Sequence, residues 1–213
     1  MGDLDSSTGC KIGIREMYKS LLFVVFSLIM SLAPELKSAE FKSGKDYWEM
    51  AQVEGIPVAV DDNLYFTWLG CDSCRKIEKE LAQELEDFEV VPLIARQEWR
   101  PAAKAFYVIK MLDSKSDAWL DIKQIVEDGE LDPTDQKALF AAIIDLGFEQ
   151  EAVAELLEDK MLYRRIDQAE ALAKTYAVQY VPTVIVKGQY ATDARHTMTV
   201  KKFGQVLDYL KSL

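Results

Sequence analysis

The chain has 213 residues and a formal net charge of −11, and 49% of its residues are hydrophobic. This length suffices for one sizeable core, or for one domain that carries an insertion. A surface this acidic would repel a phosphate backbone, and the sequence contains no Gly-rich phosphate loop. The composition therefore argues against nucleic-acid binding.

An apolar run of about twelve residues, Leu21–Leu32, lies near the N-terminus. It falls short of the roughly twenty residues that a membrane-spanning helix needs, and it follows Lys19, as the apolar part of a secretory signal follows a positive charge. We therefore expect residues 1–39 to direct export, with cleavage after Ala39 or after Ala33 and with Met17 as a second candidate for the start of translation. An uncleaved membrane anchor is the alternative.

Three segments after this signal have the β-branched and aromatic composition of strands. They are Val58–Val60, Leu64–Trp68 and Phe88–Ala95. Pro92 lacks the N–H that a central strand needs, which favours an edge position or a bulge for the third segment. A helix is predicted from Cys71, before that third segment, because apolar residues recur there at spacings of three and four. These residues are Cys74, Ile77, Leu81 and Leu85.

A helical block is predicted next, from Pro101 to Tyr176. Proline suits a first helical position, so Pro101 marks where the block begins. Within the block, Asp132 followed by Pro133 predicts the start of a helix that ends at Gly147. Two apolar stripes predict a helical core. They are Leu139, Phe140, Ile143 and Leu146, and then Leu162, Ile166, Ala169, Leu172 and Tyr176.

Strand signals return at Thr183–Val186 and Gln189–Thr192, and the turn residues between them predict a hairpin. Thr199 then caps a last amphipathic helix. Strands that alternate with helices predict a layered α/β sheet, with the helical block inserted into it. The expected organisation is a sheet domain in two parts around the insertion, at residues 40–98, 99–176 and 177–213.

The cysteines carry the strongest chemical signal. Cys10 lies before the apolar run, so the exported part holds only Cys71 and Cys74. Cysteines at i and i+3 lie on one helix face, close enough for a disulfide, but so short a loop restrains the unfolded chain little. At the first turn, free backbone N–H groups and the helix dipole favour the thiolate of Cys71. We therefore predict a redox pair in which Cys71 is the nucleophile and Cys74 is the resolving thiol.

A metal site is the usual alternative for a Cys-x-x-Cys pair. A zinc site would need a second pair of ligands, but no second pair exists and His196 is the only histidine. A soft-metal carrier, such as a copper chaperone, is a further alternative. We expect no metal and no cofactor beyond the disulfide itself.

These segments together resemble the DsbA family of periplasmic disulfide oxidoreductases over essentially all of the exported part. Phe41–Tyr47 is similar to the mature N-terminus of the family, and Phe66–Cys74 lies where the family has its strand and active-site helix. Tyr180–Thr183 resembles the family's cis-proline loop, and Val184–Tyr190 resembles its final hairpin.

The resemblance implies a thioredoxin fold with an inserted helical domain, in a periplasmic enzyme that introduces disulfides into exported proteins with free cysteines. It implies that Val181 and Pro182 bind substrate beside the redox pair, across a cis peptide bond. It also implies reoxidation by a quinone-linked membrane oxidase of the DsbB kind, and we expect a monomer. A reductase or isomerase of the same fold stays open, as does a peptide-binding chaperone that does not depend on its thiols.

Two positions depart from the family. Asp72 and Ser73 stand between the cysteines, where the family usually has Pro-His, and Tyr65 stands where it commonly has a buried glutamate. A negative charge at Asp72 disfavours ionisation of Cys71, while a hydrogen bond from Ser73 offsets this by about 1 kcal/mol. We therefore expect Asp72 and Ser73 to tune the pair to a less oxidising potential than Pro-His gives, and Tyr65 to be a core residue.

The export signal can be tested directly. A fusion of residues 1–45 to a reporter that is active only after export should give a signal, because the apolar run would direct the reporter across the membrane. Val24→Arg together with Val25→Arg interrupts that run and should abolish the signal. A silent unmodified fusion that stays in the cytosol would refute the prediction.

Overall fold

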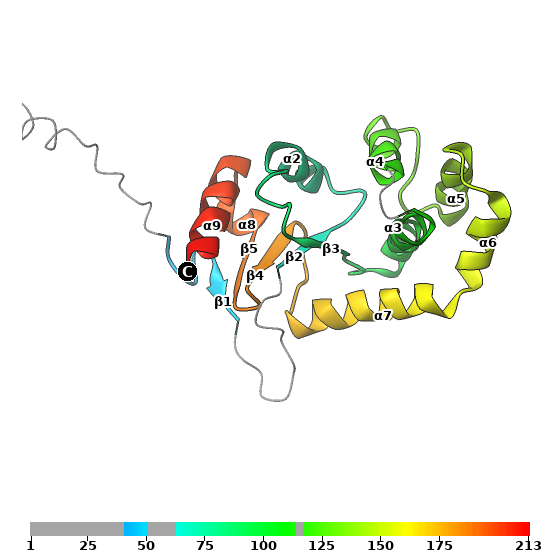
Figure 1. The fold of residues 1–213 in the computed structure, drawn as a ribbon. Coiled ribbons are helices and arrows are strands. Elements are labelled where there is room, and N and C mark those ends of the chain that lie inside the picture. Colours follow the sequence, from blue (N-terminus) through cyan, green and yellow to red (C-terminus); the bar gives the residue numbers. More distant parts are fainter. Residues whose placement is uncertain (1–40, 51–62, 114–116) are drawn as a thin grey trace, which may run out of the picture. The chain divides into compact units, whose positions relative to one another are not determined.

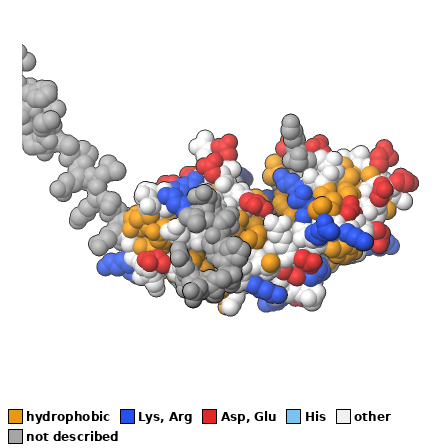
Figure 2. Space-filling view, turned by 60° about the horizontal axis from the view of Figure 1, so that its bottom comes forward, with side chains coloured by type: hydrophobic (Ala, Val, Ile, Leu, Met, Phe, Trp, Pro, Cys, Tyr) orange, Lys and Arg blue, Asp and Glu red, His pale blue; other side chains and the backbone are white. Residues whose placement is uncertain are grey.

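The computed structural model describes residues 41–50, 63–113 and 117–213. The predicted signal, Cys10 and the strand expected at Val58–Val60 lie outside these residues. Within the described ranges, no helix is both long and apolar enough to cross a membrane. Charged side chains of both signs are interspersed over the face that Figure 2 shows.

A five-stranded sheet forms the centre of the described chain, in the order β1-β5-β4-β2-β3 (Figure 1). Strands β2 and β3 are parallel, and the other neighbours are antiparallel. The edge position predicted from Pro92 is confirmed, because β3 has only β2 beside it in the sheet. The strands are β1 (Trp48–Glu49), β2 (Leu64–Thr67), β3 (Glu89–Pro92), β4 (Thr183–Val186) and β5 (Tyr190–Asp193).

Helices cover both faces of the sheet (Figure 1). Helices α3 to α7 lie between β3 and β4 in sequence, where the helical block is predicted, and α2 connects β2 to β3. The helices are α2 (Asp72–Glu80), α3 (Arg100–Leu112), α4 (Ala118–Glu127), α5 (Gln136–Asp145), α6 (Gln150–Glu158), α7 (Lys160–Thr175), α8 (Ala194–Thr197) and α9 (Val200–Ser212), and a 3₁₀ turn, Gln97–Trp99, precedes α3.

Side chains of the central strands alternate between two hydrophobic clusters, as the pleat of a strand requires. In β2, Leu64 and Phe66 face the cluster that the helical block completes, while Tyr65 faces the cluster beneath α2 and α9. All four residues of β2 are buried, because helices cover both of its faces. Other members of the first cluster are Ile109, Ile122, Leu139, Ile143, Leu162 and Ile166, and of the second Ile77, Val184, Val186, Phe203 and Leu207.

Two predicted helix boundaries are wrong. The helix expected from Asp132 begins after Asp135, whose carboxylate accepts a hydrogen bond from the backbone N–H of Ala138 at 3.0 Å. Asp132 instead accepts one from the N–H of Thr134 at 2.8 Å, which forms a turn and delays the helix. Helix α2 ends at Glu80, so Leu85 follows the helix in place of extending its stripe.

The predicted hairpin is confirmed by β4 and β5, and Thr199 caps α9 by accepting a hydrogen bond from the N–H of Lys202 at 3.2 Å. In β1, Trp48 pairs with Ala191 of β5, a strand that the sequence did not reveal. Two residues are too few to establish a period of alternating side chains.

His196 is partly buried and has two close side-chain neighbours. It lies in α8, with its ring centroid 5.0 Å from that of Trp48 and its Nδ1 2.7 Å from Oδ1 of Asp193. Burial would raise the pKa of Asp193, but hydrogen bonds from His196 and Arg195 outweigh it and hold that pKa below its usual range. The carboxylate of Asp193 therefore anchors α8 against the sheet.

The core of the helical block should be sensitive to truncation. Leu162 is fully buried in α7, whereas its neighbour Met161 is 44% exposed. Leu162→Ala should lower the free energy of unfolding by about 2–5 kcal/mol, because it removes buried methyl groups and leaves a cavity. Urea unfolding of the oxidised protein measures the loss. Met161→Ala is the matched control and should change it by less than about 0.5 kcal/mol. Equal losses would contradict the assigned burial.

Candidate active site

The cysteine pair follows strand β2 and lies at the end of the sheet. After Thr67 the chain turns through residues 68–70, and the N–H of Cys71 donates to the carbonyl of Trp68 at 3.0 Å. Gly70 is required in this turn, because a Cβ atom there would collide with the ring of Trp68. Cys71 then becomes the N-cap of α2, with extended backbone angles, so its sulfur lies at the N-terminus of the helix.

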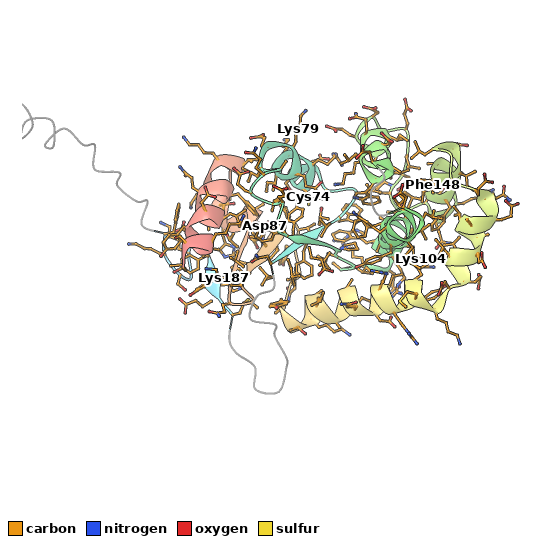
Figure 3. All side chains as sticks on the ribbon, in the orientation of Figure 1. Cys74, Lys79, Asp87, Lys104, Phe148 and Lys187 are labelled. Atoms are coloured by element: carbon orange, nitrogen blue, oxygen red, sulfur yellow. A yellow bond between two sulfur atoms is a disulfide. The ribbon has the colours of Figure 1, made fainter. Side chains whose placement is uncertain are left out.

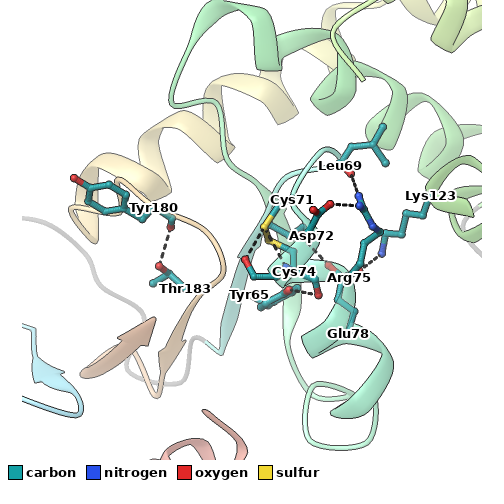
Figure 4. Close-up of a disulfide and its surroundings, with 12 residues drawn as sticks. Tyr65, Leu69, Cys71, Asp72, Cys74, Arg75, Glu78, Lys123, Tyr180 and Thr183 are labelled. Atoms are coloured by element: carbon teal, nitrogen blue, oxygen red, sulfur yellow. Dashed lines mark hydrogen bonds and ion pairs between the residues drawn. A yellow bond between two sulfur atoms is a disulfide. The ribbon is translucent and has the colours of Figure 1, made fainter. Parts of the chain in front are cut away.

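Cys71 and Cys74 are joined in a disulfide, with their Cα atoms 5.2 Å apart (Figure 4). The N–H of Cys74 donates to Sγ of Cys71 at 3.1 Å, and Oγ of Ser73 lies 3.3 Å from the same sulfur. Cys71 is 9% exposed and Cys74 only 1%, on the side of α2 that faces the sheet, while Lys79 points away (Figure 3). The two sulfur atoms are therefore unequal in access and in hydrogen bonding.

A pocket opens beside the disulfide and brings several predicted site residues together. Cys71, Asp72, Ser73 and Val181 line it, while Pro182 is buried and does not. The Val181–Pro182 peptide bond is cis, as expected. Residues far apart in the sequence therefore meet at one surface next to the cysteines.

Two further walls of this pocket are formed by residues that the sequence did not indicate as site residues. Trp99 stacks on Trp68 with ring centroids 4.2 Å apart and planes at 7°, which gives one flat aromatic wall. Met198 lines another side and is 79% exposed, in a left-handed conformation with φ 62°. No local pattern links these residues to Cys71, because folding alone brings them together.

A polar cluster lies beneath α2 on the side of the helical block. The hydroxyl of Tyr65 donates to the carbonyl of Cys74 at 3.3 Å, and Thr67 donates to Glu78 at 2.8 Å. Lys123 of α4 pairs with Glu78 at 2.5 Å (Figure 4). Burial raises the pKa of Tyr65 well above its usual value, and the negative charge of Glu78 raises it further. Tyr65 is thus the core residue that the sequence predicts, and it also binds the backbone of the redox helix as a neutral donor.

Asp72 is exposed, but its carboxylate is not alone. Arg75, one turn further along α2, forms an ion pair with it and also donates to the carbonyl of Leu69 at 3.2 Å (Figure 4). The i,i+3 spacing of Asp72 and Arg75 is the one sequence signal that indicates this pair. The negative charge assigned to Asp72 is therefore partly compensated.

Metal binding finds no support in the described ranges, where no three His, Cys, Asp or Glu side chains come together as a metal site would require.

Comparison with known proteins agrees with this geometry. No family model matches the chain. It is 26% identical over 202 residues to the thiol:disulfide interchange protein DsbA of Burkholderia cepacia, covering 90% of this chain and 93% of that protein. The DsbA protein of Pseudomonas syringae pv. tomato is 24% identical over 206 residues, covering 92% and 94%. The chain is thus similar to DsbA proteins along most of its length.

Solved structures support the same fold. The crystal structure of Pseudomonas aeruginosa DsbA superposes with a TM-score of 0.70 at 18% identity, over 81% of this chain and 93% of that one. The oxidoreductase DsbA of Xylella fastidiosa gives a TM-score of 0.66 at 17% identity, over 81% and 99%. The fold is therefore the thioredoxin fold with a helical insertion, as the resemblance implied.

The inequality of the two sulfur atoms predicts unequal reactivity. In the reduced protein, iodoacetamide should alkylate Cys71 much faster than Cys74, because Cys71 faces the pocket and the helix N-terminus favours its thiolate. Mass spectrometry of peptides after short labelling times measures both rates. Equal rates, or faster labelling of Cys74, would overturn the assignment of roles.

Proposed function

We propose that the protein introduces disulfide bonds into exported proteins by thiol–disulfide exchange. The observation that carries this proposal is the disulfide between Cys71 and Cys74 at the start of α2, with Cys71 lining a pocket and Cys74 buried. A disulfide across so short a loop adds little stability, so its value lies in being broken and remade.

The exchange follows from this asymmetry. A substrate thiolate attacks Sγ of Cys71, the bond between the two cysteines breaks, and Cys74 leaves as a thiolate and takes up a proton. A second substrate thiolate then attacks the substrate sulfur of the mixed disulfide, and Cys71 leaves as a thiolate. The substrate gains a disulfide, and its two electrons remain on Cys71 and Cys74. The N–H of Cys74 and the hydroxyl of Ser73 both lie within hydrogen-bond distance of the departing sulfur of Cys71.

Substrate binding is proposed for the loop at Val181 and Pro182. Val181 lines the pocket beside Cys71, and strand β4 begins two residues later, at Thr183. An extended peptide in the pocket would therefore lie alongside the loop that carries Val181. The Proteus mirabilis DsbA has been solved with a non-covalently bound peptide, PWATCDS, and superposes with a TM-score of 0.63 at 13% identity, over 82% of this chain and all of that one. We propose that cysteine-containing peptides bind this chain in the pocket beside Cys71.

Reoxidation requires an acceptor for the two electrons. We propose a DsbB-like membrane oxidase, linked to quinone, and a periplasmic location reached through the N-terminal signal or with that signal retained as an anchor. The DsbA relatives support both proposals. We further propose that the enzyme acts as a monomer and needs no cofactor beyond its disulfide.

Variants of the pair test this function. Cys71→Ser should abolish oxidation of a reduced, unfolded substrate such as ribonuclease, because no disulfide is left for the substrate thiolate to attack. Cys74→Ser, mixed with a substrate whose cysteines are already joined in a disulfide, should instead accumulate mixed disulfides. The Cys71 thiolate opens the substrate disulfide and releases one substrate thiolate, and no resolving thiol then displaces Cys71, so the product is visible by non-reducing electrophoresis. Full activity in either variant would contradict the mechanism.

The same assay separates the rival functions. A chaperone that does not depend on its thiols would still promote folding with both cysteines replaced by serine. The equilibrium of the Cys71–Cys74 pair with glutathione separates an oxidase from a reductase, because an oxidase must have the higher potential.

A further inference from the structure

The residue pair at the first turn of α2 suggests a role that the cysteine motif alone does not reveal. The side chain of Asp72 is 80% exposed, whereas that of Arg75 is only 17% exposed, although the two form an ion pair. An unpaired acid between two redox cysteines would disfavour ionisation of the neighbouring thiol. Here a sheltered cation is held against it.

A second contact fixes where this cation lies. Nη1 of Arg75 donates to the carbonyl of Leu69 at 3.2 Å, and the backbone N–H of Arg75 donates to the carbonyl of Cys71 at 3.2 Å. The guanidinium therefore joins the turn before Cys71 to the residue after it, as Figure 4 shows. Both ends of the segment that carries the reactive sulfur are bound to one side chain.

Helix stability does not account for a cation at this place. The N-terminus of a helix carries partial positive charge, so a guanidinium in the first turn gains nothing from the dipole. An i,i+3 ion pair on a helix contributes only a few tenths of a kcal/mol. The location of Arg75 is better explained by its effect on the neighbouring acid and sulfur.

We propose that Arg75 is a positioning and charge-compensating residue of the redox pair, which prevents the carboxylate of Asp72 from opposing thiolate formation at Cys71. The inference rests on the proposed function of the same site and deepens it. With Arg75 in place, Asp72 and Ser73 lower the oxidising strength of the enzyme by less than the charge of Asp72 alone would lower it.

Other charged side chains near this ion pair lie on α2 and α4. Asp72 and Arg75 share a groove with Lys76, Glu78, Lys79, Glu80, Lys123 and Glu127. Among the pocket residues, the charged side chains are Asp72 and Lys76, both from α2. The residues that line the pocket from the turn after β2, from the loop before β4 and from residues 194–200 carry no charge. Lys76 is kept in every variant below, so its contribution cancels.

The test compares two substitutions of Arg75 in the reduced protein. Arg75→Gln removes the charge and should raise the pKa of Cys71 by about one unit, which reduces its thiolate about tenfold at a fixed pH below that pKa. Arg75→Lys keeps the charge and should leave the pKa within about 0.3 units of wild type. Thiolate absorbance against pH measures each value, and the glutathione equilibrium should shift so that Arg75→Gln is less oxidising.

Two controls make the result specific. Lys79→Gln removes a positive charge from the last turn of the same helix and should leave the pKa of Cys71 unchanged. Raising the salt concentration to 1 M should narrow the difference between Arg75→Gln and wild type, because salt screens charges. Should Arg75→Gln fail to fold, Arg75→Met is a second neutral variant that keeps an apolar stem.

An unchanged pKa in the neutral variants, or an equal rise in Arg75→Lys, would overturn the proposal, since hydrogen bonding or packing would then explain Arg75. The thiolate measurement does not depend on oxidase activity. A wild-type protein that oxidises no substrate would refute the proposed function but leave the role of Arg75 to be decided by the pKa values.

Discussion

Burial of β2 between two hydrophobic clusters is the constraint on which the site depends. Leu64 and Phe66 point to one cluster and Tyr65 to the other, so the strand cannot slip by one residue without exposing apolar side chains. The turn that follows therefore ends at a fixed place, and Cys71 caps α2 there. The N-terminus of α2, with its free N–H groups, is thereby fixed at the end of the sheet, beside the loop of Val181.

The helical block contributes to this site as well as to the core. Trp99, at the end of the 3₁₀ turn before α3, stacks on Trp68 and forms a wall of the pocket. Lys123 of α4 pairs with Glu78 of α2, and both side chains are only 18% exposed. The insertion thus holds the redox helix from one side, while α9 packs against it from the other through the cluster that contains Phe203. The orientation of α2 is determined by both contacts together.

Local electrostatics around Cys71 differ from what the dipeptide alone suggests. Considered by itself, Asp72 places a negative charge beside the sulfur, while Ser73 supplies one hydrogen-bond partner. The structure adds Arg75, which binds Asp72 and the carbonyl of Leu69. A carboxylate that is paired with a sheltered guanidinium has less effect on a neighbouring thiol than an unpaired carboxylate. Residues other than Asp72 and Ser73 therefore contribute to the redox properties of Cys71 and Cys74.

The sequence by itself determined the redox pair, the fold class and most of the strands, because these depend on spacing and on composition along a short stretch of chain. The i,i+3 cysteines, the alternation in Leu64–Thr67 and the hairpin at Thr183–Asp193 are local signals. Tertiary structure alone decided which distant side chains surround Cys71, namely Trp99, Val181 and Met198. It also decided that His196 is bound to Asp193 and Trp48. Contacts between residues far apart in the chain leave no periodic pattern, since they arise only when packing of the two clusters brings the elements together.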